Sequence, residues 1–243
     1  MKKLTIALSF IAFAIPFQSC NPEEVLNGLS QGLSNDEVVK GLKSALSVGT
    51  DSSVKRLSAT DGYFKDMAVK ILLPPEAAPI FDKVSKIPGG QALIDKTIEA
   101  INRSAEDAAP QAANIFVDAI TNISIADGMN ILKGHDSAAT GYLKDNTYDS
   151  LKGVFAPKIN ASLGKPIVFN ASAASLYTEL VDGYNTASLN GILWPKITQN
   201  TLGDYVTAKA LTGLFHKVAV EEGKIRTDVS HRVNDILKKV FGE

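Results

Sequence analysis

The amino-acid sequence predicts an all-α protein: a single multi-helix bundle of about ten short to medium helices, with at most one short extended segment. Three observations predict this class. Apolar residues recur at three- and four-residue spacing in segment after segment, as in helices that bury one face. Capping residues precede many of these segments, and glycine or proline ends them. The sequence shows no internal repeat, no low-complexity tract and no second domain.

The helical domain is expected to begin at Ser34. Ser34 and Glu37 match a capping box, which starts a helix through DEVVKGLKSALSVG. A second helical piece is expected in TDSSVKRLSATDGYF, with a break at Asp61-Gly62. The segment AVKILLPP is the extended one, because Pro74 disfavours helix in the residue before it.

The middle of the chain alternates helices with clear breaks. Pro88-Gly89-Gly90 separates a helix in PEAAPIFDKVSKI from the following helix. One face of that following helix carries Leu93 or Ile94, then Ile98, Ile101 and Ala105. Pro110 fits the first turn of the next helix. Ser124 caps a further short helix that Gly134 ends.

The last third predicts a helix capped by Thr147, which Pro157 must bend or end. Three later helices follow from their apolar stripes. These stripes are Tyr177, Leu180, Val181 and Tyr184; Val206, Ala210, Leu214 and Val218; and Val229, Val233, Ile236, Leu237 and Val240.

Residues 1–19 have the layout of a secretory signal peptide. Lys2 and Lys3 precede an apolar run of about 14 residues, whereas a membrane-spanning helix needs roughly 20. The run ends at Ser19-Cys20, and Cys20 is the only cysteine in the chain. The sequence FQSC resembles a bacterial lipobox, in which the cysteine is acylated and becomes the first mature residue; the alternative is an ordinary buried thiol.

This layout predicts residues 1–19 as a removed lipoprotein signal peptide, 20–33 as a lipidated tether and 34–243 as the helical domain. Acylation of Cys20 would anchor the protein in the bacterial cell envelope, at the outer membrane facing the periplasm, with surface display left open. Without residues 1–19 the chain holds 23 basic and 26 acidic residues, so no basic surplus points to nucleic acid. The partners expected are the membrane, and either an envelope protein or a small ligand.

Several segments together resemble a bacterial envelope family known as domain of unknown function 4197. They run in order from about residue 38 to the C-terminus, and this resemblance implies a helical envelope protein that is lipid-anchored or secreted. It implies no reaction. The segments are GLKSALSVGTDSSVKRLSATDGYF, VKILLP, INRSAEDAAPQAANIFVDAI, ILKGHDSAATGYL, YVTAKALTGLFHKVAVEEGKIR and DILKKVFG.

The stretch INRSAEDAAP is the most site-like in the chain. On a helix, Arg103 lies one turn from Glu106 and Asp107, and Asn102 shares a face with Glu106. Small alanine neighbours would allow these polar groups to be partly buried. Two interpretations remain: an internal ion pair that sets helix register, or a ligand-facing site.

A second cluster, EEGKIR, contains Glu222 and Arg226. Arg226 could pair with an acid on another helix, such as Glu106, or bind a carboxylate or phosphate. In GHDSAATGYL, Asp136 and Thr140 could line a pocket, although Asp136 or Ser137 could equally cap a helix.

Catalytic and cofactor motifs are poorly represented. His135, His216 and His231 are far apart and match no zinc pattern, and no phosphate-binding glycine loop is present, so neither metal nor cofactor is expected. Gly28-Leu29-Ser30-Gln31-Gly32 matches a nucleophile elbow by letters alone, without the required strand. The leading hypothesis is a non-enzymatic binding or assembly domain; the alternative is a small-ligand carrier or enzyme with a site at Arg103, Glu106 and Arg226.

Overall fold

The computed structural model describes residues 34–86, 88–168, 170–198 and 202–232, together with residues 235, 238 and 240. The all-α class is confirmed, but the expected number of about ten short to medium helices is wrong. The described helices are fewer, and three of them are long. They are α2 (Asn35–Ser58), α3 (Ala78–Val84), α4 (Gly90–Ala108), α5 (Ala112–Thr121), α6 (Ile125–Lys133), α7 (Ala138–Leu163), α8 (Ala173–Ala187) and α9 (Leu202–Thr227), with short 3₁₀ turns at Pro75–Ala77, Ala109–Gln111 and Val229–His231.

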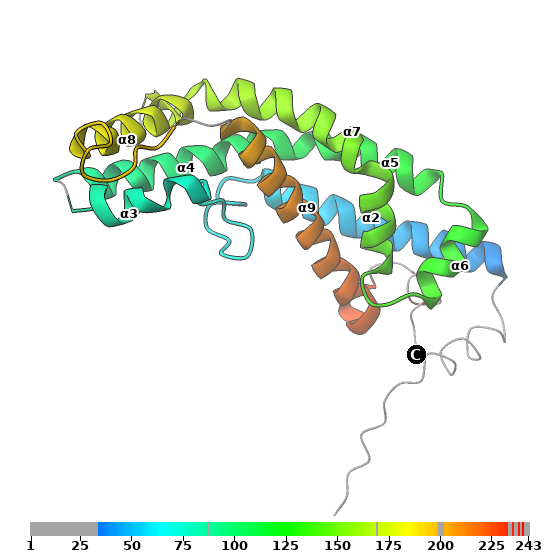
Figure 1. The fold of residues 1–243 in the computed structure, drawn as a ribbon. Coiled ribbons are helices and arrows are strands. Elements are labelled where there is room, and N and C mark those ends of the chain that lie inside the picture. Colours follow the sequence, from blue (N-terminus) through cyan, green and yellow to red (C-terminus); the bar gives the residue numbers. More distant parts are fainter. Residues whose placement is uncertain are drawn as a thin grey trace, which may run out of the picture.

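The helices form one elongated bundle (Figure 1). Helices α4 and α7 lie alongside each other, α9 crosses them, and α2 packs against α9 and α5. Helices α3 and α8 pack together at one end of the molecule, and α6 lies at the other. One continuous apolar core runs through all of these helices.

Helix α2 starts as the sequence predicts but does not break where expected. The Ser34 side chain accepts a hydrogen bond from the amide of Glu37, and both halves of the capping box are present. The helix then continues through Gly49 and Thr50, both buried, to Ser58. A Cβ on Gly49 would lie 3.5 Å from Glu221 Cβ of α9, an ordinary contact distance, so Gly49 lies at the interface of α2 with α9 and not in a turn.

Helix α7 merges two helices that the sequence separated. It passes through both Thr147 and Pro157, so the predicted cap at Thr147 is wrong. The Thr147 hydroxyl instead donates to the carbonyl of Leu143, one turn earlier in the same helix. A buried stripe continues at four-residue intervals along this helix, and packing of that stripe against α4 and α9 outweighs the local signals. Its members include Leu143, Thr147, Leu151, Phe155, Ile159 and Leu163.

Residues 59–74 connect α2 to the next elements by a path held against α4. The break predicted at Asp61-Gly62 is present, with Asp61 in the left-handed region at φ 70°. A Cβ on Gly62 would collide with the carbonyl oxygen of Arg56, so the turn requires glycine. Residues 70–74 have no regular secondary structure, and the extended segments that do pair are Pro166–Val168 and Ala171–Ser172, an antiparallel hairpin that the sequence analysis missed.

Some predictions fall on parts of the chain outside the described residues. These are the signal peptide, Cys20 and the tether, the Gly28–Gly32 match, and most of the last apolar stripe. Among the described residues, no single helix has the length and apolar character needed to cross a membrane. The bent pair Gly90–Thr121 and Ile125–Lys133, with 104° between its parts, meets that test jointly on length and composition.

Candidate functional site

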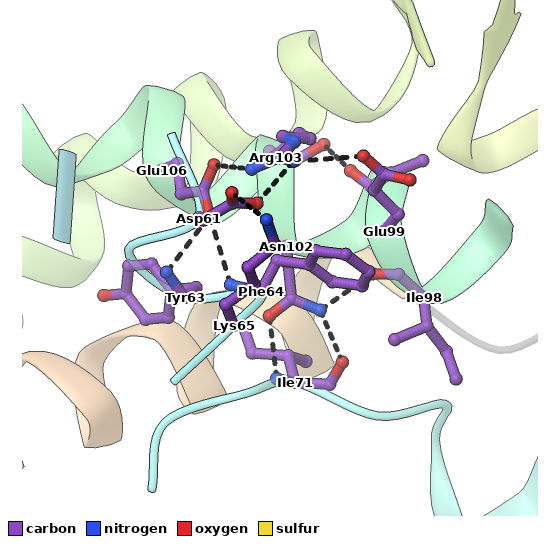
Figure 2. A network of polar contacts seen from close by, with 12 residues as sticks. Asp61, Tyr63, Phe64, Lys65, Ile71, Ile98, Glu99, Asn102, Arg103 and Glu106 are labelled. Carbon is purple, nitrogen blue, oxygen red and sulfur yellow. Dashed lines mark hydrogen bonds and ion pairs between the residues drawn. The ribbon is translucent and has the colours of Figure 1, made fainter. Parts of the chain in front are cut away.

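The stretch INRSAEDAAP lies on α4 and faces the connection 59–74. Arg103 forms ion pairs with three carboxylates: Nη1 to Glu106 Oε2 at 2.8 Å, and Nη2 to Asp61 Oδ1 at 2.7 Å and to Glu99 Oε1 at 3.0 Å. We call these four residues the Arg103 cluster (Figure 2). Lys65 adds a second cation, 2.8 Å from Asp61 Oδ2. All the charged groups of the cluster therefore find opposite charges inside the molecule.

Glu106 joins this cluster to the backbone of the connection. Its Oε1 accepts hydrogen bonds from the amides of Tyr63 and Phe64, both at 3.1 Å, while Oε2 pairs with Arg103 (Figure 2). The Glu106 side chain is only 6 % exposed. The oxygens of Glu106 are therefore occupied by one charged partner and two amide donors. These bonds hold the turn after α2 against α4.

Asn102 does the same work one helical turn before Glu106 on α4, where it is fully buried. Its Oδ1 accepts from the Ile71 amide at 2.9 Å, and its Nδ2 donates to the Ile71 carbonyl at 2.7 Å and to the Ile98 carbonyl at 2.7 Å. The side-chain amide thus replaces the partner strand that Ile71 lacks.

The electrostatics of the cluster favour charged, paired groups. Hydrogen bonds from Lys65 and Arg103 hold the pKa of Asp61 below its ordinary value. Burial alone would lower the pKa of Arg103, but hydrogen bonds to Glu106 and Asp61 outweigh burial and raise it. The guanidinium also lies over the Phe64 ring, 5.4 Å from its centroid.

A second cluster lies where α9 meets the start of α7; we call Glu222, Arg226 and Thr140 the Glu222 cluster. Glu222 Oε1 accepts from the Ala139 amide at 3.1 Å, and Oε2 accepts from the amide and hydroxyl of Thr140 at 2.8 and 2.7 Å. Arg226 Nη2 lies 2.8 Å from Glu222 Oε1 and also donates to the Ile131 carbonyl at 3.3 Å. A carboxylate at the N-terminus of α7 satisfies free amides and interacts favourably with the helix dipole.

The Glu222 cluster borders a small apolar cavity of about 20 Å³ between α2 and α9. Aliphatic side chains and Gly49 make up most of its wall. A space of this size holds a single water molecule at most, because the smallest hydrated cavities need about 10–15 Å³. The two charged side chains at its edge, Glu222 and Arg226, are bonded to each other, and the Thr50 hydroxyl donates to the Leu46 carbonyl.

A family model described as Protein of unknown function (DUF4197) matches residues 32–242. The chain belongs to the DUF4197 family. The matched region contains both clusters and every described helix of this DUF4197 protein. No curated protein and no solved structure matches the chain. The suspected family is thus confirmed, and its description assigns it no activity.

The structure separates the three residues of the hypothetical DUF4197 ligand site. Arg103 and Glu106 belong to one cluster, and Arg226 belongs to the other. The suggested pairing of Arg226 with Glu106 is wrong, because Arg226 binds Glu222 on its own helix. Asp107 lies outside both clusters and pairs with Lys158 at 3.2 Å.

The residues of GHDSAATGYL are divided in the same way. Thr140 is buried and joins the Glu222 cluster, whereas Asp136 is exposed. Ser137 occupies the N-cap position of α7, but its side chain makes no capping hydrogen bond. The predicted local cap is therefore wrong, and the cap comes from α9 instead. Gly134 ends α6 as predicted, in an extended conformation with a φ of −77°.

Sequence reasoning missed Glu99 as a partner of Arg103, although its i,i+4 spacing could have found it. It also missed two distant participants: Asp61 as a partner of Arg103, and Glu222 as a cap for α7. Asp61 lies 42 residues from Arg103, and Glu222 lies 82 residues from Thr140. No local spacing reports such contacts. Within the part of the chain that the structure describes, no three His, Cys, Asp or Glu side chains gather closely enough to hold a metal ion.

Asp66 and Lys217 form another ion pair, between the connection 59–74 and α9. The contribution of this pair to stability should depend on pH. The hydrogen bond from Lys217 holds the pKa of Asp66 below its ordinary value of 3.8. Because the folded-state pKa is the lower one, this pair stabilises the fold fully above about pH 4 and loses its effect as the pH falls further.

Asp66→Asn should therefore destabilise the protein at about pH 6, and the difference from wild type should shrink at about pH 2.5. Urea unfolding followed by helical circular dichroism at the two pH values measures this. Asp51→Asn, which removes an exposed pair with Lys55 on α2, is the control and should change little at either pH. A wild-type advantage that is equal at both pH values would contradict the assignment.

Proposed function

We propose that this DUF4197 protein is a lipid-anchored domain of the bacterial cell envelope that acts by binding or assembly rather than by catalysis. The observation that carries the proposal is the layout of residues 1–20: two lysines, a short apolar run, a small residue and the only cysteine. Thirteen residues then separate Cys20 from Ser34, where the helical domain begins. Such a spacer suits a folded domain held beside a lipid surface.

The state of the polar clusters supports a non-catalytic role. A catalytic acid, base or nucleophile needs a group that can reach a substrate. In the Arg103 cluster and the Glu222 cluster, the charged groups bond to one another or to the backbone, and the neighbouring cavity has room for a water molecule only. The geometry of the two clusters therefore favours their interpretation as internal ion pairs over a ligand site of a carrier or an enzyme.

The anchor can be tested by the mass of the protein purified from bacterial membranes. We expect the mature chain to begin at Cys20 and to carry the added mass of a diacylglycerol, with or without a further acyl chain. Cys20→Ser should abolish this added mass and leave residues 1–19 in place. An unmodified Cys20 preceded by an intact leader in the wild-type protein would refute the proposal.

A further inference from the structure

The loop after α8 exposes apolar side chains at the end of the molecule where α3 and α8 pack (Figure 1). Leu189, Ile192 and Leu193 are 56, 80 and 59 % exposed. Other exposed large apolar residues among the described ones are spread over several elements, whereas these three lie within five residues. We call residues 188–194 the apolar tip. Exposed clusters of this kind mark interaction sites.

The backbone of the apolar tip is held in a demanding conformation. Leu189, Asn190 and Gly191 all have positive φ, at 52°, 55° and 102°. Leucine rarely adopts this region, and non-glycine residues kept there usually serve a function that the surrounding structure enforces. The positive φ angles of this turn therefore indicate that the apolar side chains are exposed because they serve a function.

Hydrogen bonds at the C-terminal end of α8 fix the turn. Ser188 is fully buried; its hydroxyl donates to the Asn185 carbonyl at 2.7 Å and accepts from the Gly191 amide at 2.9 Å. The Leu193 amide donates to the Ser188 carbonyl at 3.0 Å, which closes the loop. Asn185 also bonds to both backbone groups of Ile197. The apolar side chains are thus presented on a rigid base, so binding would not require the turn to become ordered.

The base of the tip carries an aromatic ring and cations. Trp194 packs against Tyr184, with ring centroids 6.0 Å apart, and Lys83 of α3 lies over the Trp194 ring at 4.8 Å. Lys196 is exposed two residues later. Exposed aliphatic residues, a partly buried tryptophan and exposed lysines are the residue types found at bilayer interfaces. Asp82, beside Lys83 in sequence, keeps the local net charge small, so apolar insertion should provide most of the binding.

We propose that the apolar tip inserts into the interfacial region of a lipid bilayer and is a second membrane contact, independent of Cys20. The combination of exposed aliphatic residues, a tryptophan and lysines favours lipid over a protein partner, because these residue types match a bilayer interface. Lysines beside the tip suit anionic headgroups. The contact would set how the domain lies relative to the membrane.

Unacylated mature protein tests this without interference from the anchor. Residues 20–243 with Cys20→Ser contain every described residue, and Trp194 is the only tryptophan. Mixed with vesicles of phosphatidylethanolamine and phosphatidylglycerol, this protein should co-sediment, and Trp194 emission should move to shorter wavelength and be quenched by brominated acyl chains. Vesicles of phosphatidylcholine alone should bind it more weakly.

The key variant combines Leu189→Asn, Ile192→Ser and Leu193→Ser, since asparagine tolerates positive φ. Its vesicle partition coefficient should fall about tenfold or more, with unchanged helical circular dichroism. A matched control, Met67→Ser with Val117→Ser and Ile125→Ser, removes three exposed apolar side chains elsewhere and should bind like the parent.

Three results would overturn the proposal. They are failure of the parent protein to bind vesicles, binding that survives in the tip variant, and self-association in the absence of lipid that the tip variant abolishes. None of them bears on the acylation of Cys20, which is measured separately by mass, so failure of this inference and failure of the proposed anchor are distinguishable.

Discussion

Glu222→Ala is expected to lower the free energy of unfolding by about 3–5 kcal/mol, the range seen when one partner of a buried ion pair is removed. The Glu222 side chain is only 5 % exposed. Its loss leaves the amides of Ala139 and Thr140 without their acceptor and leaves Arg226, 16 % exposed, without its carboxylate. Chemical denaturation followed by circular dichroism at 222 nm, a wavelength set by the helical backbone, measures the change.

Two further variants sharpen this test. Glu222→Gln keeps an acceptor for the α7 amides but loses the charge, so its cost should lie between those of wild type and alanine. Glu179→Ala, on the exposed face of α8, is the control and should change stability by less than about 0.5 kcal/mol. If Glu222→Ala costs no more than Glu179→Ala, the cap does not hold α7 to α9.

Asn102→Leu should cost about 3 kcal/mol, although leucine has a similarly branched side chain and is apolar in an apolar core. The reason is that Ile71 loses its partners for both the amide and the carbonyl, and each buried unsatisfied group costs about 1–3 kcal/mol. Thermal unfolding by calorimetry gives the loss, and hydrogen exchange should show faster exchange of the Ile71 amide.

The control for this variant is Asn146→Leu on α7. The Asn146 side chain also donates to a carbonyl one turn back, that of Tyr142, but it is exposed, so water can replace the bond. We expect a change within about 0.5 kcal/mol. Equal stability of Asn102→Leu and wild type would mean that the connection 59–74 does not depend on the side-chain amide.

Local signals in the sequence predicted the helices well where capping and periodicity agreed. The capping boxes at Ser34 and Ser124 are present, and the break at Pro88-Gly89-Gly90 falls where expected. Signals that compete with packing predicted helix ends that the structure does not have. Thr147 and Pro157 are typical of helix ends, but a buried stripe at four-residue spacing continues α7 through both, and that stripe was the usable signal.

The polar clusters could be predicted in part. The pair of Arg103 with Glu106 lies within one helical turn and follows from spacing alone. The partners that decide what the cluster does, the amides of Tyr63 and Phe64, are more than 40 residues away and depend on how α2 and α4 pack. The apolar tip was missed because its exposure, rather than its composition, distinguishes it from core sequence.

The cap of α7 has a consequence for the order in which the molecule forms. Synthesis proceeds from the N-terminus, so residues 138–163 are made before residue 222. The amides in the first turn of α7 therefore lack their acceptor, the Glu222 carboxylate, until that residue has been added. A fragment that stops short of Glu222 keeps the whole of α7 but lacks the acceptor for the Ala139 and Thr140 amides, so we expect limited proteolysis of such a fragment to begin at this turn.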